Sequence, residues 1–200
     1  MTIYALKSRF QALLRPFVVL LVRIGVKANH VTIAACVVSI AIGFAIINAP
    51  RIWFAIIPAW MFLRMGFNAI DGMLAREFNQ KSNLGAYLNE LTDVISDAAL
   101  YLPFAFVVPF DWRSVGATIF AAALSEMTGV VGVMIGAARR YDGPMGKSDR
   151  AFIFGLLGLL AGIGAEIGVL LPWVWAALAL LIAATIVNRV RRGLSAPRGS

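Results

Sequence analysis

Long apolar stretches, separated by short polar segments, run through almost the whole chain. Most approach the roughly 20 residues that an α-helix needs to cross a bilayer. The pattern predicts six spans, at residues 31–49, 53–69, 86–110, 115–138, 152–171 and 173–190. Pro50, Pro172 and the turn at 111–114 mark three tight connections. We therefore predict an all-α polytopic membrane protein with about six transmembrane helices.

Residues 2–25 show a different pattern, in which basic and apolar side chains interleave. Such a helix can lie in the membrane interface with its basic residues toward the lipid headgroups. The alternative is an extension of the first span. On the interfacial interpretation the headgroup side carries Lys7, Arg9, Arg15 and Arg23. We divide the chain into an amphipathic juxtamembrane helix (1–28), a six-helix transmembrane domain (29–192) and a cytoplasmic tail (193–200).

Composition supports the membrane prediction. Apolar residues make up 60% of the chain and charged residues 14%, against roughly 45–50% and about 25% in soluble domains. The net charge of +8 could indicate nucleic acid, but the charges lie between the apolar stretches and not on one soluble face. We therefore expect membrane lipids and no nucleic acid as partners. The N-terminal stretch is too basic and too interrupted for a cleavable signal peptide.

The basic residues alternate from connection to connection. Of the 18 Lys and Arg residues, only Arg51 and Arg113 fall on one side of the six predicted spans, and the others fall on the opposite side. Cytoplasmic loops of membrane proteins are enriched in Lys and Arg. The pattern predicts that both termini are cytoplasmic.

Polar residues recur at helical spacing on both sides of the connection between the second and third spans. Residues three or four positions apart share one face of a helix. A short connection makes the two helices antiparallel neighbours, so we expect their polar stripes to face each other near the cytoplasmic mouth of the bundle. The stripes consist of Arg64, Asn68 and Asp71 on the second span and Asn89, Asp93 and Asp97 on the third.

These stripes have the chemistry of a metal and phosphate site. Acids in spanning helices are costly and normally face partners or a wet cavity. Oxygen ligands from two helices suit a hard divalent cation such as Mg²⁺ or Mn²⁺, and Arg76 could pair with a phosphate. The small residues Gly72, Ala75 and Gly85 either permit close helix packing or let a charged ligand approach the backbone.

The segment from residue 68 to residue 93 resembles the signature of the CDP-alcohol phosphatidyltransferase family, D-x-x-D-G-x-x-A-R, eight residues, then G-x-x-x-D-x-x-x-D. The matching positions are Asp71, Gly72, Ala75, Arg76, Gly85 and Asp93. Asn29 and Thr32, just before the first span, are similar to a short Asn-x-x-Thr segment of the same family. The chain looks most similar to a bacterial inner-membrane branch of that family.

The resemblance implies a homodimer whose cytoplasm-facing sites bind a CDP-linked lipid and Mg²⁺ or Mn²⁺. It implies nucleotide binding by Thr32, Asp71, Gly72, Ala75, Arg76 and Gly85, metal binding by Asn68, Asp71, Asn89 and Asp93, and a catalytic role for Asp93. The chain departs from the signature at Asn68 and Asn89, where the family has acids. Asparagine is a neutral oxygen ligand, so a second divalent ion would need charge from Asp97 or Glu90.

Two further features remain open. The segment 139–150 combines glycines with basic residues, which indicates either the charge bias of a cytoplasmic loop or donors for phosphate. Related enzymes hold an anionic acceptor with basic residues here and at the end of the sixth span, which suggests Lys147, Arg150 and Arg189. Glu126, in the fourth span, is either a satisfied buried acid or a contact to the site.

These expectations describe a transferase of phospholipid biosynthesis. A phosphatidyl group of a lipid such as CDP-diacylglycerol passes to an acceptor alcohol, which can be anionic, and CMP is released. Asp93 accepts the proton of the acceptor hydroxyl. One alternative is a non-catalytic CDP-lipid or nucleotide binder with the same fold. The other is a small transporter, because acids inside a membrane also mark ion paths, although the chain shows no internal repeat.

Overall fold

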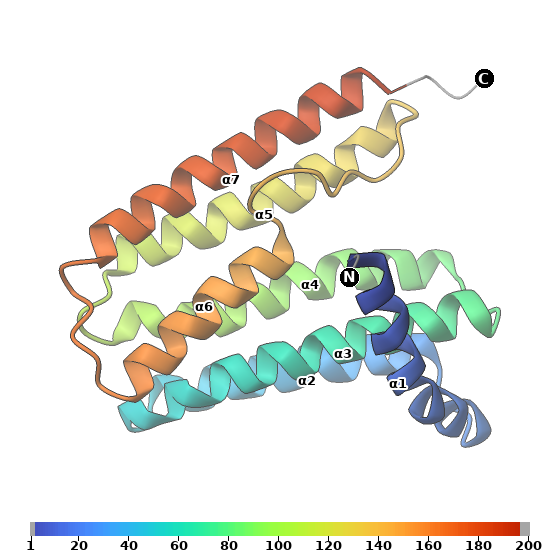
Figure 1. Ribbon diagram of the computed structural model, residues 1–200, viewed down its shortest axis with the longest axis horizontal. Helices are drawn as coiled ribbons and strands as arrows, with labels where there is room; N and C mark the ends of the chain where they lie inside the picture. Colours follow the sequence, from blue (N-terminus) through green and yellow to red (C-terminus); the bar gives the residue numbers. More distant parts are fainter. Residues whose placement is uncertain (1–2, 197–200) are drawn as a thin grey trace.

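The protein is described here from a computed structural model, which covers residues 3–196. Within these residues it is entirely helical, as the hydrophobic pattern predicts. The helices are α1 (Ile3–Arg23), α2 (Ala28–Ile47), the 3-10 helix η1 (Arg51–Ala55), α3 (Ile56–Glu77), α4 (Asn83–Tyr101), the 3-10 helix η2 (Leu102–Phe106), α5 (Trp112–Met134), α6 (Lys147–Gly162) and α7 (Leu171–Leu194). Helices α2 to α7 run side by side as a bundle (Figure 1).

Four helical segments in the described chain are long and apolar enough to cross a membrane: α2, η1 with α3, α5 and α7. Helix α4 carries the acidic stripe, and α6 has only 16 residues, short of the roughly 20 that a bilayer requires. The chain is thus an integral membrane protein by composition and length. Six complete spans stay a prediction.

The predicted limits of the fifth span are wrong. The sequence suggested residues 152–171, whereas α6 runs from Lys147 to Gly162. It begins early because the Asp149 carboxylate accepts a hydrogen bond from the Gly146 backbone N–H at 2.8 Å, which caps the helix at polar residues. It ends early because Gly164 adopts φ +77°, a left-handed conformation typical of the residue after a helix. The third span also ends early, since α4 stops at Tyr101 and η2 continues to Phe106.

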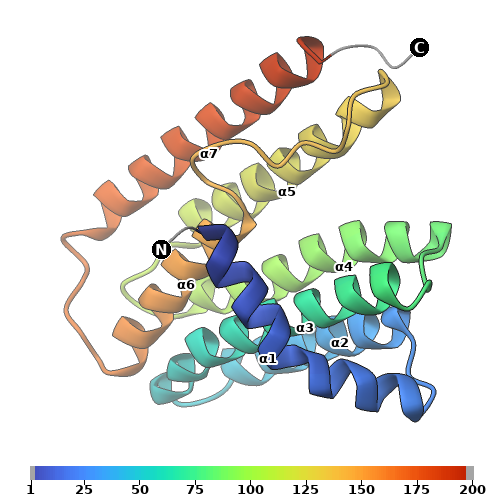
Figure 2. The same ribbon diagram turned by 45° about the vertical axis from the view of Figure 1, so that its right-hand side comes forward.

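The predicted N-terminal helix is present as α1, which crosses the bundle beside α3 (Figure 2). Val18 is fully buried, whereas Leu13 and Phe17 are exposed. Arg15 forms an ion pair of 2.9 Å with Glu77 at the end of α3. The placement of α1 in the membrane interface stays a prediction. The side chains of Lys7 and Arg9 and residues 197–200 of the predicted tail lie outside the described part of the chain.

Small residues set the helix packing. A Cβ added at Gly43 of α2 would collide with the Ala99 carbonyl of α4, and one at Gly158 of α6 would lie 2.9 Å from the Phe54 carbonyl of η1. These close approaches are the reason that glycine is needed at both positions. Helix α5 pairs with α7 on the other side of the bundle (Figure 1).

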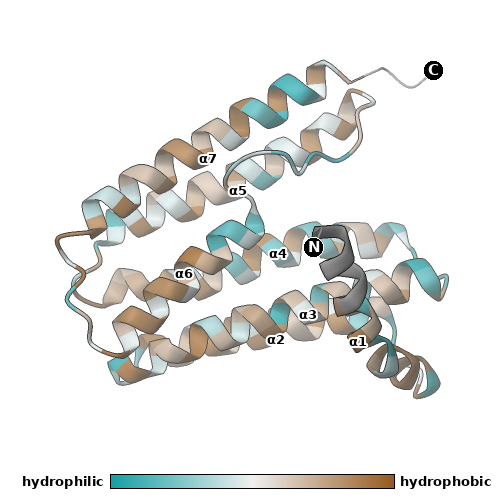
Figure 3. Ribbon diagram, in the orientation of Figure 1, coloured by the Kyte–Doolittle hydropathy of each residue, from teal (hydrophilic) through white to brown (hydrophobic). Residues whose placement is uncertain are grey.

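The connection between α5 and α6 folds back into the bundle and does not stay at its end (Figures 1 and 2). The Arg140 N–H donates to the Gly129 carbonyl of α5 at 3.1 Å, and the Met145 N–H donates to the Thr185 hydroxyl of α7 at 2.9 Å. Helix α6 therefore begins part-way along α4. Figure 3 shows hydrophilic residues at this point as well as at the ends of the helices.

Candidate functional site

The two polar stripes meet between α3 and α4. Arg64 of α3 donates to the Asp97 carboxylate of α4 at 2.5 Å and to the Asp93 carbonyl at 3.3 Å. Arg64, Asp71 and Asp97 are all buried. The prediction that the stripes face each other is confirmed for these residues, although the contact that joins them is an ion pair and not a shared ligand.

The N-terminal end of α2 completes this side of the site. The Thr32 hydroxyl donates to the Asp71 carboxylate at 2.9 Å. Gln80, in the α3–α4 loop, accepts a hydrogen bond from the Ala28 N–H at 2.8 Å, which holds that loop against the start of α2. A Cβ added at Gly85 would lie 2.9 Å from the Asn29 side chain. Glycine at position 85 therefore allows the start of α4 to lie close to the start of α2.

Arg76 is an exposed cation of this region. Its guanidinium curls back over Gly72, because a Cβ added at Gly72 would lie 2.7 Å from an Arg76 nitrogen. Within the part of the chain that the structure describes, Arg76 forms no ion pair, whereas most basic residues around the site do. Its charge is available to a ligand.

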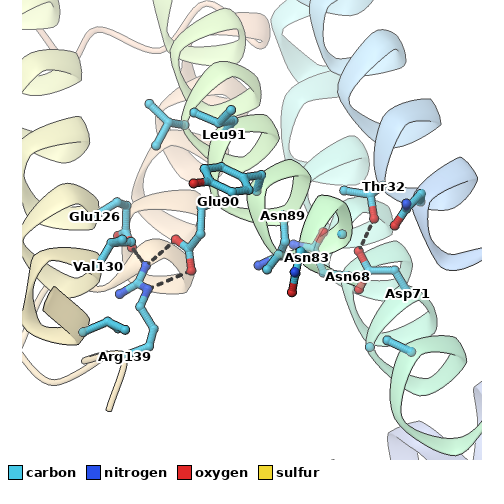
Figure 4. A pocket seen from close by; sticks show the side chains of 18 of the residues that line it. Thr32, Asn68, Asp71, Asn83, Asn89, Glu90, Leu91, Glu126, Val130 and Arg139 are labelled. Carbon is cyan, nitrogen blue, oxygen red and sulfur yellow. Dashed lines mark hydrogen bonds and ion pairs between the residues drawn. The ribbon is translucent and has the colours of Figure 1, made fainter. Parts of the chain in front are cut away.

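These residues line a cavity of about 1340 Å³ that extends from the α3–α4 loop along α4 to α5. Its polar end contains Asn68, Asp71 and Asn89, which Figure 4 shows together with Thr32. Its opposite wall is apolar and consists of Leu91, Ile95, Phe120, Leu124, Met127, Val130 and Met134. The cavity thus joins a polar, partly charged end to an apolar wall that could pack against hydrocarbon chains.

Asp93 is held by cations from two helices. Lys147, the first residue of α6, donates to the Asp93 carboxylate, and Arg64 lies 3.6 Å from the same carboxylate. Lys147 reaches Asp93 only because the α5–α6 connection folds back into the bundle. Of the three basic residues suggested by the family resemblance as acceptor contacts, Lys147 is therefore the one that meets a motif acid.

The other two surround Glu126. Arg150 of α6 donates to Glu126 at 2.9 Å and lies 3.4 Å from Asp97. Arg189 of α7 lies 3.3 Å from Glu126 and donates to the Ser125 carbonyl. Both arginines are buried, at 0% and 2% exposure. Their terminal guanidinium nitrogens bind protein groups, whereas the buried Nε of Arg150 has no hydrogen-bond partner among the described residues.

Arg139, in the folded-back connection, links Glu126 to the cavity. It donates to Glu126 at 2.8 Å and to both oxygens of Glu90 at 2.8 and 2.9 Å (Figure 4). Burial alone would lower the pKa of Arg139, but the hydrogen bonds to Glu90 and Glu126 outweigh it and raise the pKa above its ordinary value. Arg139 remains a cation at any pH at which the protein is folded. The sequence left open the roles of Glu126 and of the segment that contains Arg139, and only a lone acid in an apolar helix indicated this cluster.

The oxygen donors at the polar end allow a divalent cation. No group of three or more His, Cys, Asp or Glu side chains that could hold a metal occurs among the residues that the structure describes. A cation bound here would use the Asp71 and Asp93 carboxylates with the amide oxygens of Asn68 and Asn89. Two carboxylates balance the charge of one divalent ion, so the donor set fits at least one ion.

Comparisons with known proteins agree with the motif. A family model described as CDP-alcohol phosphatidyltransferase matches residues 25–188. Inner membrane protein YnbA of Escherichia coli is 44% identical over 195 residues, covering 96% of each chain. Phosphatidylinositol phosphate synthase of Mycobacterium tuberculosis is 25% identical over 198 residues, covering 93% of this chain and 86% of the relative.

Solved structures of that mycobacterial synthase share the fold. The crystal structure with CDP-DAG bound has a TM-score of 0.73 and 22% identity, and covers 91% of this chain and 94% of the other. The crystal structure in complex with manganese and citrate has a TM-score of 0.74 at the same identity, and covers 91% and 89%.

Proposed function

This chain belongs to the CDP-alcohol phosphatidyltransferase family, and on that premise we propose that it transfers a phosphatidyl group from CDP-diacylglycerol to an acceptor alcohol. The observation that carries the proposal is a cavity that joins motif residues such as Asp71 and Arg76 to an apolar wall on α4 and α5. A CDP-linked lipid needs both parts, because its pyrophosphate is anionic and its acyl chains are apolar. The mycobacterial relative was crystallised with CDP-DAG bound, which supports the choice of donor.

Each motif residue then has a role. Arg76, exposed and without an ion-pair partner in the described chain, binds the pyrophosphate. Gly72, Ala75 and Gly85 supply small surfaces beside the nucleotide, and Thr32 orients the Asp71 carboxylate through its hydrogen bond. A divalent cation, Mg²⁺ or Mn²⁺, would be held by Asp71, Asp93, Asn68 and Asn89 and would neutralise pyrophosphate charge.

The chemical step exchanges one phosphorus–oxygen bond for another. The acceptor hydroxyl oxygen attacks the lipid-linked phosphorus, the bond from that phosphorus to the CMP oxygen breaks, and CMP leaves. Asp93 takes the hydroxyl proton. Lys147 and Arg64 hold the Asp93 carboxylate from two sides, so the orientation of this base depends on α3 and α6 together.

The membrane arrangement follows the same premise. We propose six spans, with α4 and η2 as the third and α6 as the fifth, both termini on the cytoplasmic side, and the site at the cytoplasmic end. The charge asymmetry of the connections supports this orientation.

We also propose a homodimer, which cross-linking in native membranes would test by the appearance of a species of twice the chain mass.

Release of CMP is the deciding experiment. Purified protein is incubated with CDP-diacylglycerol and Mn²⁺, acceptor alcohols are supplied one at a time, and products are identified by lipid mass spectrometry. Acceptor-dependent CMP release that disappears in Asp93→Asn is the expected result. If the protein binds CDP-diacylglycerol but releases no CMP from it with any acceptor, the alternative is favoured, a non-catalytic CDP-lipid binder.

Metal binding tests the asparagine positions separately from turnover. Mn²⁺ is titrated calorimetrically with and without CMP, on the parent protein, on Asp93→Asn and on Asn89→Asp. We expect weak binding without nucleotide and tighter binding with it, because the two carboxylates of the site balance one ion only. By linkage, Mn²⁺ must tighten nucleotide binding by the same factor. Tight binding of two ions by the parent without nucleotide would refute this ligand set.

A further inference from the structure

Glu126 is the meeting point of three arginines from different parts of the chain. Arg139 comes from the folded-back connection, Arg150 from α6 and Arg189 from α7, and their distances to the Glu126 carboxylate are 2.8, 2.9 and 3.3 Å. Glu126 itself lies in the middle of α5, among apolar residues. Its burial is compensated because both carboxylate oxygens are engaged by guanidinium groups.

Several guanidinium groups around one anion are the arrangement with which proteins bind phosphate or carboxylate ligands. Here the anion is a side chain of the protein. Arg150 and Arg189 have almost no exposed surface, and the donors of Arg139 that do not reach Glu126 bond to Glu90 and to the Arg140 carbonyl. A phosphate could reach these cations only by displacing Glu126.

The position of this cluster relates it to the reaction. Glu126 and Arg139 line the same cavity as the motif residues. Arg150 also contacts Asp97, one helical turn beyond Asp93 on α4. Glu126 and Arg139 therefore place the cluster at the cavity wall, and Arg150 joins it to α4 one helical turn from Asp93.

We propose that Glu126 is a built-in anion that closes this arginine cluster to external anions, so that the acceptor is an uncharged alcohol and not a phosphorylated one. The inference rests on the proposed transferase function and adds the substrate class. A phosphorylated acceptor would have to compete with the Glu126 and Glu90 carboxylates for the hydrogen-bond donors of these arginines. The neutral hydroxyl groups of a polyol meet no such penalty.

Oxyanion binding tests the cluster without any turnover. Thermal unfolding of Glu126→Gln is followed in detergent at increasing millimolar sulfate, against the parent and Glu166→Gln, an identical change at an exposed position. Glutamine keeps an oxygen acceptor but removes the charge. Sulfate should raise the melting temperature of Glu126→Gln clearly more than that of the other two. An equally small rise of the melting temperature with sulfate in all three proteins would overturn the proposal that Glu126 is a built-in anion.

Acceptor choice tests the substrate class. CMP release from CDP-diacylglycerol is measured with two matched pairs, glycerol with glycerol 3-phosphate and inositol with inositol 1-phosphate. The parent should use the uncharged member of a pair, and Glu126→Gln should shift kcat/KM toward the phosphorylated member by about tenfold or more, the size of one charge-assisted hydrogen bond. A purely structural Glu126 would change stability and leave this ratio unchanged.

Three outcomes separate the hypotheses. A parent enzyme that uses the phosphorylated member of a pair at least as well as the uncharged one overturns the substrate-class inference and leaves the transferase function intact. Absence of CMP release with every acceptor overturns the transferase function, and the sulfate response still decides whether Glu126 closes an anion site. If Glu126→Gln does not fold, the preference of the parent decides the inference.

Discussion

The buried ion pairs around Arg150 give the sharpest prediction of stability. Arg150 is completely buried and donates to Glu126 at 2.9 Å, to Asp97 at 3.4 Å and to the Met145 carbonyl at 3.3 Å. Methionine at this position is unbranched and replaces the aliphatic part of the arginine side chain. The substitution Arg150→Met therefore removes the charge and its hydrogen bonds while it retains most of the packing.

The expected loss of folding stability can be estimated from the partners that remain in Arg150→Met. Removing one partner of a buried ion pair costs about 3–5 kcal/mol. Asp97 keeps Arg64 at 2.5 Å, and Glu126 keeps Arg139 at 2.8 Å, so we expect the lower end, about 3 kcal/mol. A chain of this size shifts by roughly 2–4 °C per kcal/mol. The melting temperature should fall by about 6–12 °C.

The assay is thermal unfolding in detergent, followed by tryptophan fluorescence. The matched control is Arg192→Met, which removes an arginine that pairs with Asp142 at 2.9 Å but is 59% exposed. Exposed pairs contribute about 0–1 kcal/mol, so the control should stay within a few degrees of the parent. Equal shifts for the two variants would refute the buried network.

A double-mutant cycle isolates the pair itself. Glu126→Gln should cost less in the Arg150→Met protein than in the parent, because one of the arginines that lose their partner is already absent. Strictly additive shifts would mean that the contact between Arg150 and Glu126 contributes nothing to stability, whatever the single variants show.

Three further predictions follow from other parts of the chain. Arg76→Ala should weaken CDP-diacylglycerol binding about tenfold or more, the size of a lost charge-assisted hydrogen bond, with an unchanged melting temperature; unfolding with intact binding in the folded fraction would contradict it. A reporter that is active only in the periplasm should stay silent when fused at Ser200 and be active when inserted near Asp111; activity at Ser200 would overturn the topology. Burial would raise the pKa of Asp142, but its hydrogen bond from Arg140 and the nearby cations outweigh burial and lower the pKa below 3.8. Asp142→Asn should therefore destabilise the protein at pH 7, and the difference in stability between variant and parent should fade only as the pH falls below 3.8. A difference that persists in strong acid would refute the ion pairs as its cause.

The sequence by itself determined the helical membrane architecture and the composition of the polar stripes. Both are local properties, because the periodicity of a helix follows from its own residues. Asp71 and Asp97 could therefore be assigned to polar faces, and the short α3–α4 loop made those faces neighbours. The asymmetry of basic residues across the connections is likewise visible without coordinates.

Only the tertiary structure decided which charges meet. Periodicity gives the face of a helix but not the side chain opposite to it, and α6 could be placed only through contacts between distant residues. The connection between α5 and α6 is held by the hydrogen bonds from Arg140 to Gly129 and from Met145 to Thr185. Those bonds bring α6 to the middle of α4. Lys147 and Arg150, which the sequence left as loop charge or phosphate donors, therefore pair with Asp93, Asp97 and Glu126.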